Sequence, residues 1–85
     1  MENFEYVIIP DAVLRSDIGH LKAGTLMEIN SVKLFVNGAD FHCDCTYYQN
    51  NDIRTAPKYV QVHCTEIRVQ NMNRLRFLMK KLHAK

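Results

Sequence analysis

A chain of 85 residues, 47% hydrophobic and 24% charged, is long enough to fold as a single domain over 1–85 and too short for two domains. No apolar run approaches the ~20 residues of a membrane-spanning helix, and the acidic N-terminus is unlike a secretory signal, so we expect a cytoplasmic protein with no membrane partner. The odd number of cysteines also argues against the disulfide framework of a small secreted domain.

The formal net charge of +2 conceals an uneven distribution along the chain. All 9 Asp and Glu residues precede position 70, where they outnumber Lys and Arg, whereas the charges in 70–85 are all basic. The basic residues of this tail are Arg74, Arg76, Lys80, Lys81 and Lys85. Such an asymmetry indicates that one end of the molecule attracts an acidic partner.

The first half of the chain carries signals for two strands. Residues 6–9 have the β-branched and aromatic character of a strand, and Pro10 suits its end because proline cannot donate a ladder hydrogen bond. Residues 25–29 form a second strand, which continues into 32–36 through a bend at the turn-prone pair 30–31.

A β-hairpin is the clearest local signal. Asn37 and Gly38 accept the positive φ values of a two-residue type I′ turn, whose twist matches that of paired strands. The following arm, 39–48, alternates with the period of a strand buried on one face. We expect Phe41, Cys43, Cys45 and Tyr47 to face the core, and His42, Asp44, Thr46 and Tyr48 to face outward.

The second half of the chain begins with a polar segment. Residues 49–58 are interrupted by a proline, so we expect a long connecting loop, the kind of segment that often carries function. Residues 59–64 and 66–69 then restore strand character.

The C-terminal segment, 71–85, changes to the period of a basic amphipathic helix. Asn71 or Asn73 is positioned to cap its start. Phe77 lies outside the apolar stripe and among cations, which makes it either an exposed contact residue or a satellite core residue. The stripe expected to pack on the strands is Met72, Leu75, Leu78, Met79 and Leu82.

These elements predict a mainly β (α+β) fold, a small SH3-like barrel or curled antiparallel sheet of about five strands over 6–69, closed by one C-terminal helix. The order of strands and helix is similar in outline to SH3-like small barrels, and no family motif accompanies that resemblance. The alternative is a winged-helix arrangement with a helix over 16–29. Gly19 and Gly24 argue against that helix, since each glycine costs about 1 kcal/mol in a helix interior.

Two histidines and three cysteines are the candidates for metal binding or catalysis. The spacing of Cys43 and Cys45 is Cys-x-Cys, unlike the Cys-x2-Cys pattern of zinc sites, and strand alternation turns His42 and His63 away from the cysteines. A nucleophilic thiol, Cys64 or Cys45, needs a base such as His20, His42 or His63 within hydrogen-bond reach, and the same alternation turns His42 and His63 away from the cysteines. We therefore expect reduced, buried thiols, no metal or cofactor, and no enzymatic activity.

The remaining interpretation is a non-enzymatic protein-binding module of adaptor or inhibitor type, with an acidic partner surface. Small modules of this size are common among phage and mobile-element products, so such an origin is a further hypothesis that rests on size alone. The alternative is a nucleic-acid-binding protein whose helix contacts phosphates, although the acidic body disfavours it. The opposite charges of body and tail leave open a weak homodimer. The predicted contact residues are Arg74, Arg76, Phe77, Lys80, Lys81, Tyr48 and Arg54.

Overall fold

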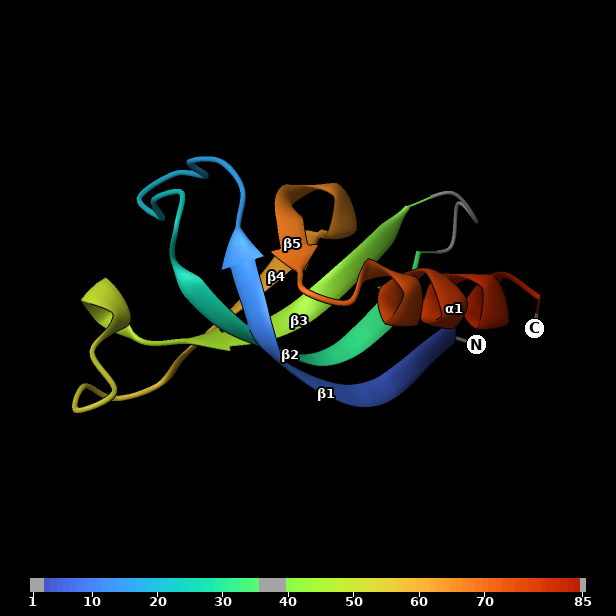
Figure 1. Ribbon diagram of the computed structural model, residues 1–85, viewed down its shortest axis with the longest axis horizontal. Helices are drawn as coiled ribbons and strands as arrows, with labels where there is room; N and C mark the ends of the chain where they lie inside the picture. The colour runs from blue at the N-terminus through green and yellow to red at the C-terminus, as the bar shows by residue number, and fades with distance from the viewer. Residues whose placement is uncertain (1–2, 36–39, 85) are drawn as a thin grey trace.

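The computed structural model describes residues 3–35 and 40–84 (Figure 1). In this part of the chain, five strands form one antiparallel sheet and a helix follows them. None of the helical segments described has the length and apolar character needed to cross a membrane. The elements are β1 (Asn3–Leu14), β2 (Leu26–Leu34), β3 (Phe41–Tyr47), the 3-10 turn η1 (Gln49–Asn51), β4 (Lys58–His63), the 3-10 turn η2 (Cys64–Glu66), β5 (Ile67–Val69) and α1 (Met72–His83).

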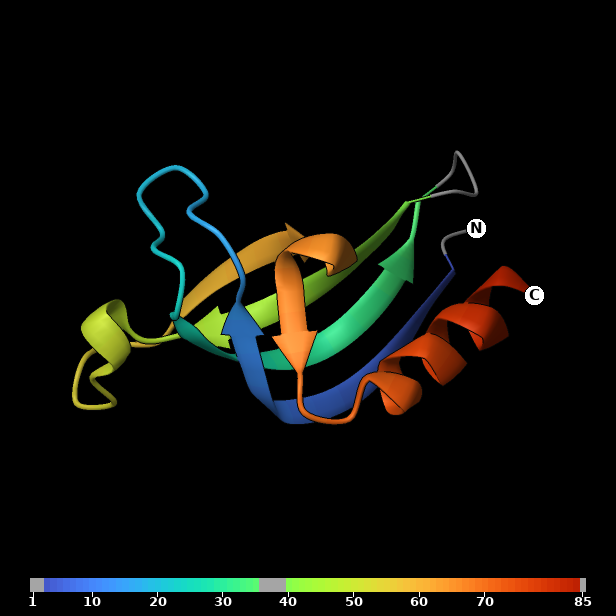
Figure 2. The ribbon, with the colours of Figure 1, turned by 45° about the horizontal axis from the view of Figure 1, so that its top comes forward.

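The sheet has the strand order β4-β3-β2-β1-β5 and curls into a half-barrel (Figures 1 and 2). Its curvature depends on β1, which is long and bends. Most of β1 pairs with β2, while its end at Ala12–Leu14 also pairs with β5 on its other side. The predicted fold class, a curled antiparallel sheet of five strands with a C-terminal helix, is confirmed.

Strand β1 is longer than the sequence pattern indicated. We expected a strand over 6–9 that ends at Pro10, but β1 continues through the proline to Leu14. The register between β1 and β2 shifts on both sides of Ile9, so Pro10 lies in an irregular stretch where no β2 residue is aligned with it. The missing N–H of proline therefore costs no regular ladder bond, and the predicted end of the strand was wrong.

Strands β2 and β3 form the expected hairpin. The register shifts between Ile29 and Ser31, which confirms the bend near 30–31, although β2 remains one strand. The predicted turn residues Asn37 and Gly38 lie outside the described residues. The inward-facing residues of β3 are Phe41, which is half-buried, and Cys43, Cys45 and Tyr47, which are buried.

The winged-helix alternative is wrong. Residues 16–29, all of which the structure describes, contain no helix and form the turn into β2 and its first residues. Gly19 has a φ of 57° and Gly24 a φ of 90°, so both adopt the left-handed conformation that glycine permits and a helix interior does not. An isolated bridge between Ile18 and Leu21 tightens this turn.

Helix α1 packs against β1, β2 and β5 and contributes to a single core cluster with the inner face of the sheet. Leu75 and Leu82 have no exposed surface, and the rest of the predicted stripe is half-buried against the core. The stripe prediction is thus confirmed. The largest fully buried side chains are Leu14, Ile29, Ile67, Leu75 and Leu82.

Candidate functional site

The rotation of α1 is fixed by a cap and by core contacts. Asn71 is the N-cap, and its Oδ1 accepts a hydrogen bond of 3.3 Å from the backbone N–H of Arg74. Burial of Leu75 and Leu82 then turns one side of the helix inward. With 3.6 residues to a turn, the helix has a side on either edge of this buried stripe. We call these two sides its flanks; one lies toward β1 and the other toward the start of β3.

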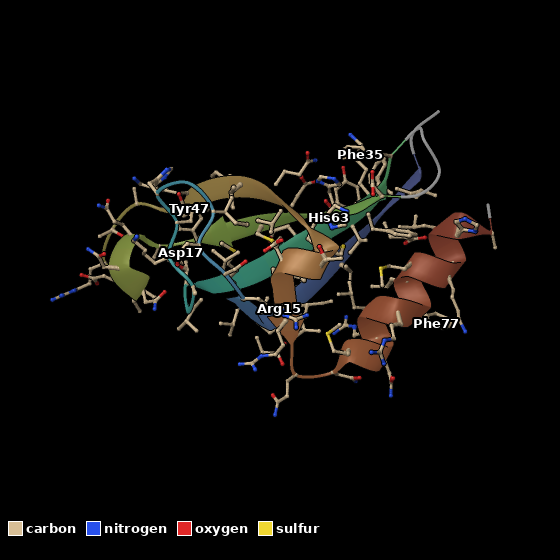
Figure 3. All side chains as sticks on the ribbon, turned by 90° about the horizontal axis from the view of Figure 1, so that it is seen from above. Arg15, Asp17, Phe35, Tyr47, His63 and Phe77 are labelled. Atoms are coloured by element: carbon tan, nitrogen blue, oxygen red, sulfur yellow. The ribbon has the colours of Figure 1, made fainter. Side chains whose placement is uncertain are left out.

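Phe77 points away from the sheet (Figure 3), and 68% of its surface is exposed. Of the two interpretations that the sequence allowed, the structure supports the exposed residue. Arg74 and Lys81, three and four positions away along the helix, are neighbours on its surface. Phe77 therefore offers aromatic contact area to a partner at the edge of a positively charged region.

On the flank toward β3, α1 and Phe41 of the sheet border a shallow, open groove of about 420 Å³. Phe41 of β3 and Met79 of α1 supply bulky apolar side chains to it, and both are half-buried. No acidic residue lines the groove in the part of the chain that the structure describes. The other lining residues are Arg76, Lys80, His83 and Ala84.

The cations of α1 differ in whether their charge is already engaged. Lys81 Nζ lies 3.0 Å from Glu5 Oε1 of β1, so Lys81 is paired within the molecule. Arg76 and Lys80 have no ion pair with any residue between 3 and 35 or between 40 and 84. Arg74, on the flank toward β1, also has no ion pair among these residues, so two of the three unpaired Lys and Arg side chains described on α1 border the groove.

Two of the predicted contact residues lie elsewhere. The turn η1, which follows Tyr48, and helix α1 lie at opposite ends of the molecule (Figures 1 and 2). Tyr48 is half-buried beside Pro10, which corrects its expected exposure. Arg54 donates hydrogen bonds from Nε and Nη2 to Asp52 at 2.9 and 3.0 Å, and these bonds lower the pKa of Asp52. The predicted contact residues therefore do not form one continuous surface.

The apolar part of the groove was not predicted from the sequence. Phe41 and Met79 were assigned to the buried faces of a strand and a helix, whereas both lie at the margin of the core. A signal was present in the helix, because Arg76, Lys80 and His83 follow one another at spacings of four and three residues on one flank. Met79 is the member of the stripe that lies at its edge, next to that flank, and this edge is where a groove can form.

The outer face of the sheet carries a group of rings in contact close to β3, one pair tilted and one pair edge-to-face. The ring centroids of Phe35 and His42 are 3.9 Å apart, and those of His42 and His63 are 5.0 Å apart. His63 Nε2 lies 3.3 Å from Asp40 Oδ1. Burial first, and then the nearby His63, lower the pKa of His42 from its ordinary value, so His42 tends to remain neutral.

The cysteines occupy the opposite, inner side of the sheet. Cys43, Cys45 and Cys64 are buried, as predicted, while His42 and His63 are half-buried on the outer face. Among the described residues, no three or more His, Cys, Asp and Glu side chains are grouped so that they could hold a metal ion.

Comparisons with known proteins give no relative from which a site could be transferred. No family model, no curated protein and no solved structure matches the chain. The interpretation of the groove therefore depends on its own geometry and charge.

Proposed function

We propose that this protein is a small non-enzymatic binding module that holds an acidic segment of a protein partner in the groove between α1 and β3. The observation that supports this most directly is the pairing of an apolar surface, Phe41 and Met79, with the cations Arg76 and Lys80 at its rim. An acidic segment with one bulky apolar side chain matches both properties.

The two parts of the groove have different physical roles in this proposal. Burial of a Leu- or Phe-sized side chain contributes about 1.5–3 kcal/mol, which makes the contact with Phe41 and Met79 the anchor. Arg76 and Lys80 act mainly on the rate of encounter and on the choice of partner, since exposed charges are screened by salt. Phe77 extends the contact area outside the groove, where 68% of it is exposed.

A nucleic-acid partner is the second candidate, and the charge distribution supports it less well. The residues before position 70 contain 9 acids and would repel a phosphate backbone that extends past α1. The pairing of Lys81 with Glu5 also reduces the number of cations available for phosphate contacts. A short protein segment, in contrast, can bind in the groove without extending over the acidic part of the surface.

Synthetic probes that carry the chemistry of each candidate partner test the proposal directly. The first probe is a labelled glutamate-rich peptide with one central phenylalanine, the second replaces that phenylalanine by alanine, and the third is a single-stranded oligothymidylate of equal charge. We expect fluorescence anisotropy to show that the first peptide binds most tightly. We also expect NMR shifts for Phe41 and the Met79 methyl group, because both would contact the apolar anchor.

The same measurements identify a wrong proposal. Equal affinity for the two peptides would mean that the phenylalanine side chain adds nothing to binding, and would contradict the proposed role of Phe41 and Met79 as the anchor. Tighter binding of the oligothymidylate, with a salt dependence of log affinity close to roughly −0.7 per phosphate contact, would favour the nucleic-acid function instead. Peptide binding that leaves Phe41 and Met79 unperturbed would place the contact elsewhere.

A further inference from the structure

Two of the buried thiols are in direct contact inside the sheet. The Sγ atoms of Cys43 and Cys64 lie 3.0 Å apart. Cys43 has no exposed surface, and 8% of Cys64 is exposed. A disulfide bond has an S–S length of about 2.05 Å, so an approach of about 1 Å would bring the two sulfurs to bonding distance.

The fold places this pair by strand register. Cys43 of β3 is aligned with Val62 of β4, and the next inward-facing side chain after Val62 is that of Cys64. The chain leaves β4 at that point and enters η2, where His63 Nδ1 accepts a hydrogen bond of 3.2 Å from the backbone N–H of Thr65. The side chain of Cys64 is thus held diagonally opposite Cys43.

Cys45 provides an internal comparison. It lies two positions from Cys43 on the same inward face and is equally buried, with 1% of its surface exposed. Its Sγ donates a hydrogen bond of 3.6 Å to the backbone carbonyl of Cys43. The close sulfur–sulfur contact therefore distinguishes Cys43 and Cys64 from a thiol with a similar degree of burial.

The two members of the pair differ in access to solvent. Cys64 is the first residue of a 3-10 turn that joins the edge strand β4 to the three-residue strand β5. A short turn at a sheet edge opens locally at a lower free-energy cost than the centre of the sheet does. Cys43 lies within β3 between two other strands, and both its hydrogen bond with Cys64 and its burial raise its pKa. An oxidant therefore reaches Cys64 first.

We propose that Cys43 and Cys64 form a site of reversible disulfide formation that reacts with peroxides, with Cys64 as the attacking thiol and Cys43 as the resolving thiol. The Cys64 thiolate attacks one oxygen of hydrogen peroxide, the O–O bond breaks, and a sulfenic acid and hydroxide are formed; the hydroxide takes up the thiol proton as water. Cys43 Sγ then attacks Cys64 Sγ, the S–O bond breaks, and the hydroxyl leaves with the Cys43 proton as a second water. Two thiols lose two electrons, and one peroxide is reduced to two waters.

The bond would connect two positions that are 21 residues apart and fasten β3 to the exit of the edge strand β4. A cross-link over a loop of this length restricts the unfolded chain and stabilises the folded protein. Oxidation would thus make this edge of the half-barrel more resistant to opening. A thiol reductant would reverse the change.

The test uses the full chain in its folded state. The protein is treated with hydrogen peroxide, free thiols are alkylated after unfolding, and the chain is cleaved before Asp44, which separates Cys43 from Cys45. Mass spectrometry should show a Cys43–Cys64 peptide pair that has lost two hydrogens, with Cys45 alkylated. The melting temperature should rise by roughly 10 °C and return after treatment with dithiothreitol.

Two cysteine variants test which thiols form the bond. Cys45→Ser should still form the bond, whereas Cys64→Ser should form none, and the wild-type peptide map decides the matter alone if Cys64→Ser does not fold. A folded protein in which peroxide produces only a Cys43–Cys45 bond, only bonds between molecules, or no disulfide would overturn the proposal.

Discussion

Lys81 Nζ lies 3.0 Å from Glu5 Oε1, which joins the last turns of α1 to the first residues of β1. The two residues belong to opposite parts of the charge asymmetry, one to the basic tail and one to the acidic body. Part of that asymmetry is therefore used within the molecule, to place the helix against the sheet. Of the helix cations that remain for a partner among the described residues, Arg76 and Lys80 lie beside the groove and Arg74 lies on the other flank.

The ion pair between Lys81 and Glu5 is expected to make a small contribution to stability. The Lys81 side chain is 50% exposed and that of Glu5 is 23% exposed, so solvent screens the interaction. A double-mutant cycle with Lys81→Gln and Glu5→Gln, followed by urea unfolding, should give a coupling free energy of about 0.2–1 kcal/mol that decreases with added salt. A coupling of zero at low salt would show that the pair does not stabilise the folded protein.

Two substitutions in α1 should have opposite effects. Leu75→Ala should lower the free energy of unfolding by about 2–5 kcal/mol, because Leu75 has no exposed surface and its loss leaves a cavity in the core. Phe77→Ala should change it by no more than about 0.5 kcal/mol, because 68% of Phe77 is exposed. Urea denaturation measures both. Equal stability of Leu75→Ala and the wild type would show that α1 is a free arm.

The stability of the protein should decrease below pH 6.5 through His42. Folding lowers the pKa of His42 from its ordinary value of 6.5, chiefly by burial and then through His63. As the pH falls through 6.5, the unfolded chain takes up a proton before the folded chain does, so the free energy of unfolding falls until the lower folded pKa is reached. Well above pH 6.5 the imidazole of His42 is neutral in both the folded and the unfolded state, and His42 makes no pH-dependent contribution.

Replacement of His42 isolates this effect from the titration of other groups. Urea unfolding of the wild type and of His42→Gln, measured from pH 8 to pH 5, should show a shallower decline for the variant. The slopes are compared, because glutamine also loses the tilted ring contact with Phe35, whose ring centroid lies 3.9 Å away. His20→Gln, at an exposed turn position, is the matched control for loss of an imidazole. Parallel curves for the wild type and His42→Gln would contradict the assignment.

Much of the fold could be predicted because its signals are local. The period of two in β3, the change of period at the start of α1 and the capping side chain of Asn71 each depend on residues close together in the sequence. The length of β1 could not be predicted in this way. Its passage through Pro10 requires a register shift against β2, and that shift is a property of the pairing between two distant segments.

The candidate site was only partly predictable for the same reason. The cations and Phe77 could be found because a helical period shows which residues lie off the buried stripe. The groove depends on the approach of Phe41 to Met79, two residues far apart in the sequence, and apolar character alone assigns both to the core. The separation of Tyr48 and Arg54 from the helix likewise follows from the sheet topology, which places η1 at the opposite end of the molecule.

The two flanks of α1 should contribute unequally to the binding of an acidic segment. The double substitutions Arg76→Gln/Lys80→Gln and Arg74→Gln/Lys81→Gln remove the same formal charge from the same helix. Loss of the groove flank should weaken binding of the phenylalanine-containing acidic peptide roughly tenfold, mainly through slower association, because these cations border the apolar anchor. Loss of the other flank should have a smaller effect, because Lys81 is already paired with Glu5.

The difference in affinity between the two variants should diminish in high salt, where exposed charges are screened. Stopped-flow association at two salt concentrations measures these effects, and equal losses for the two variants would show that α1 acts only as a uniform positive surface.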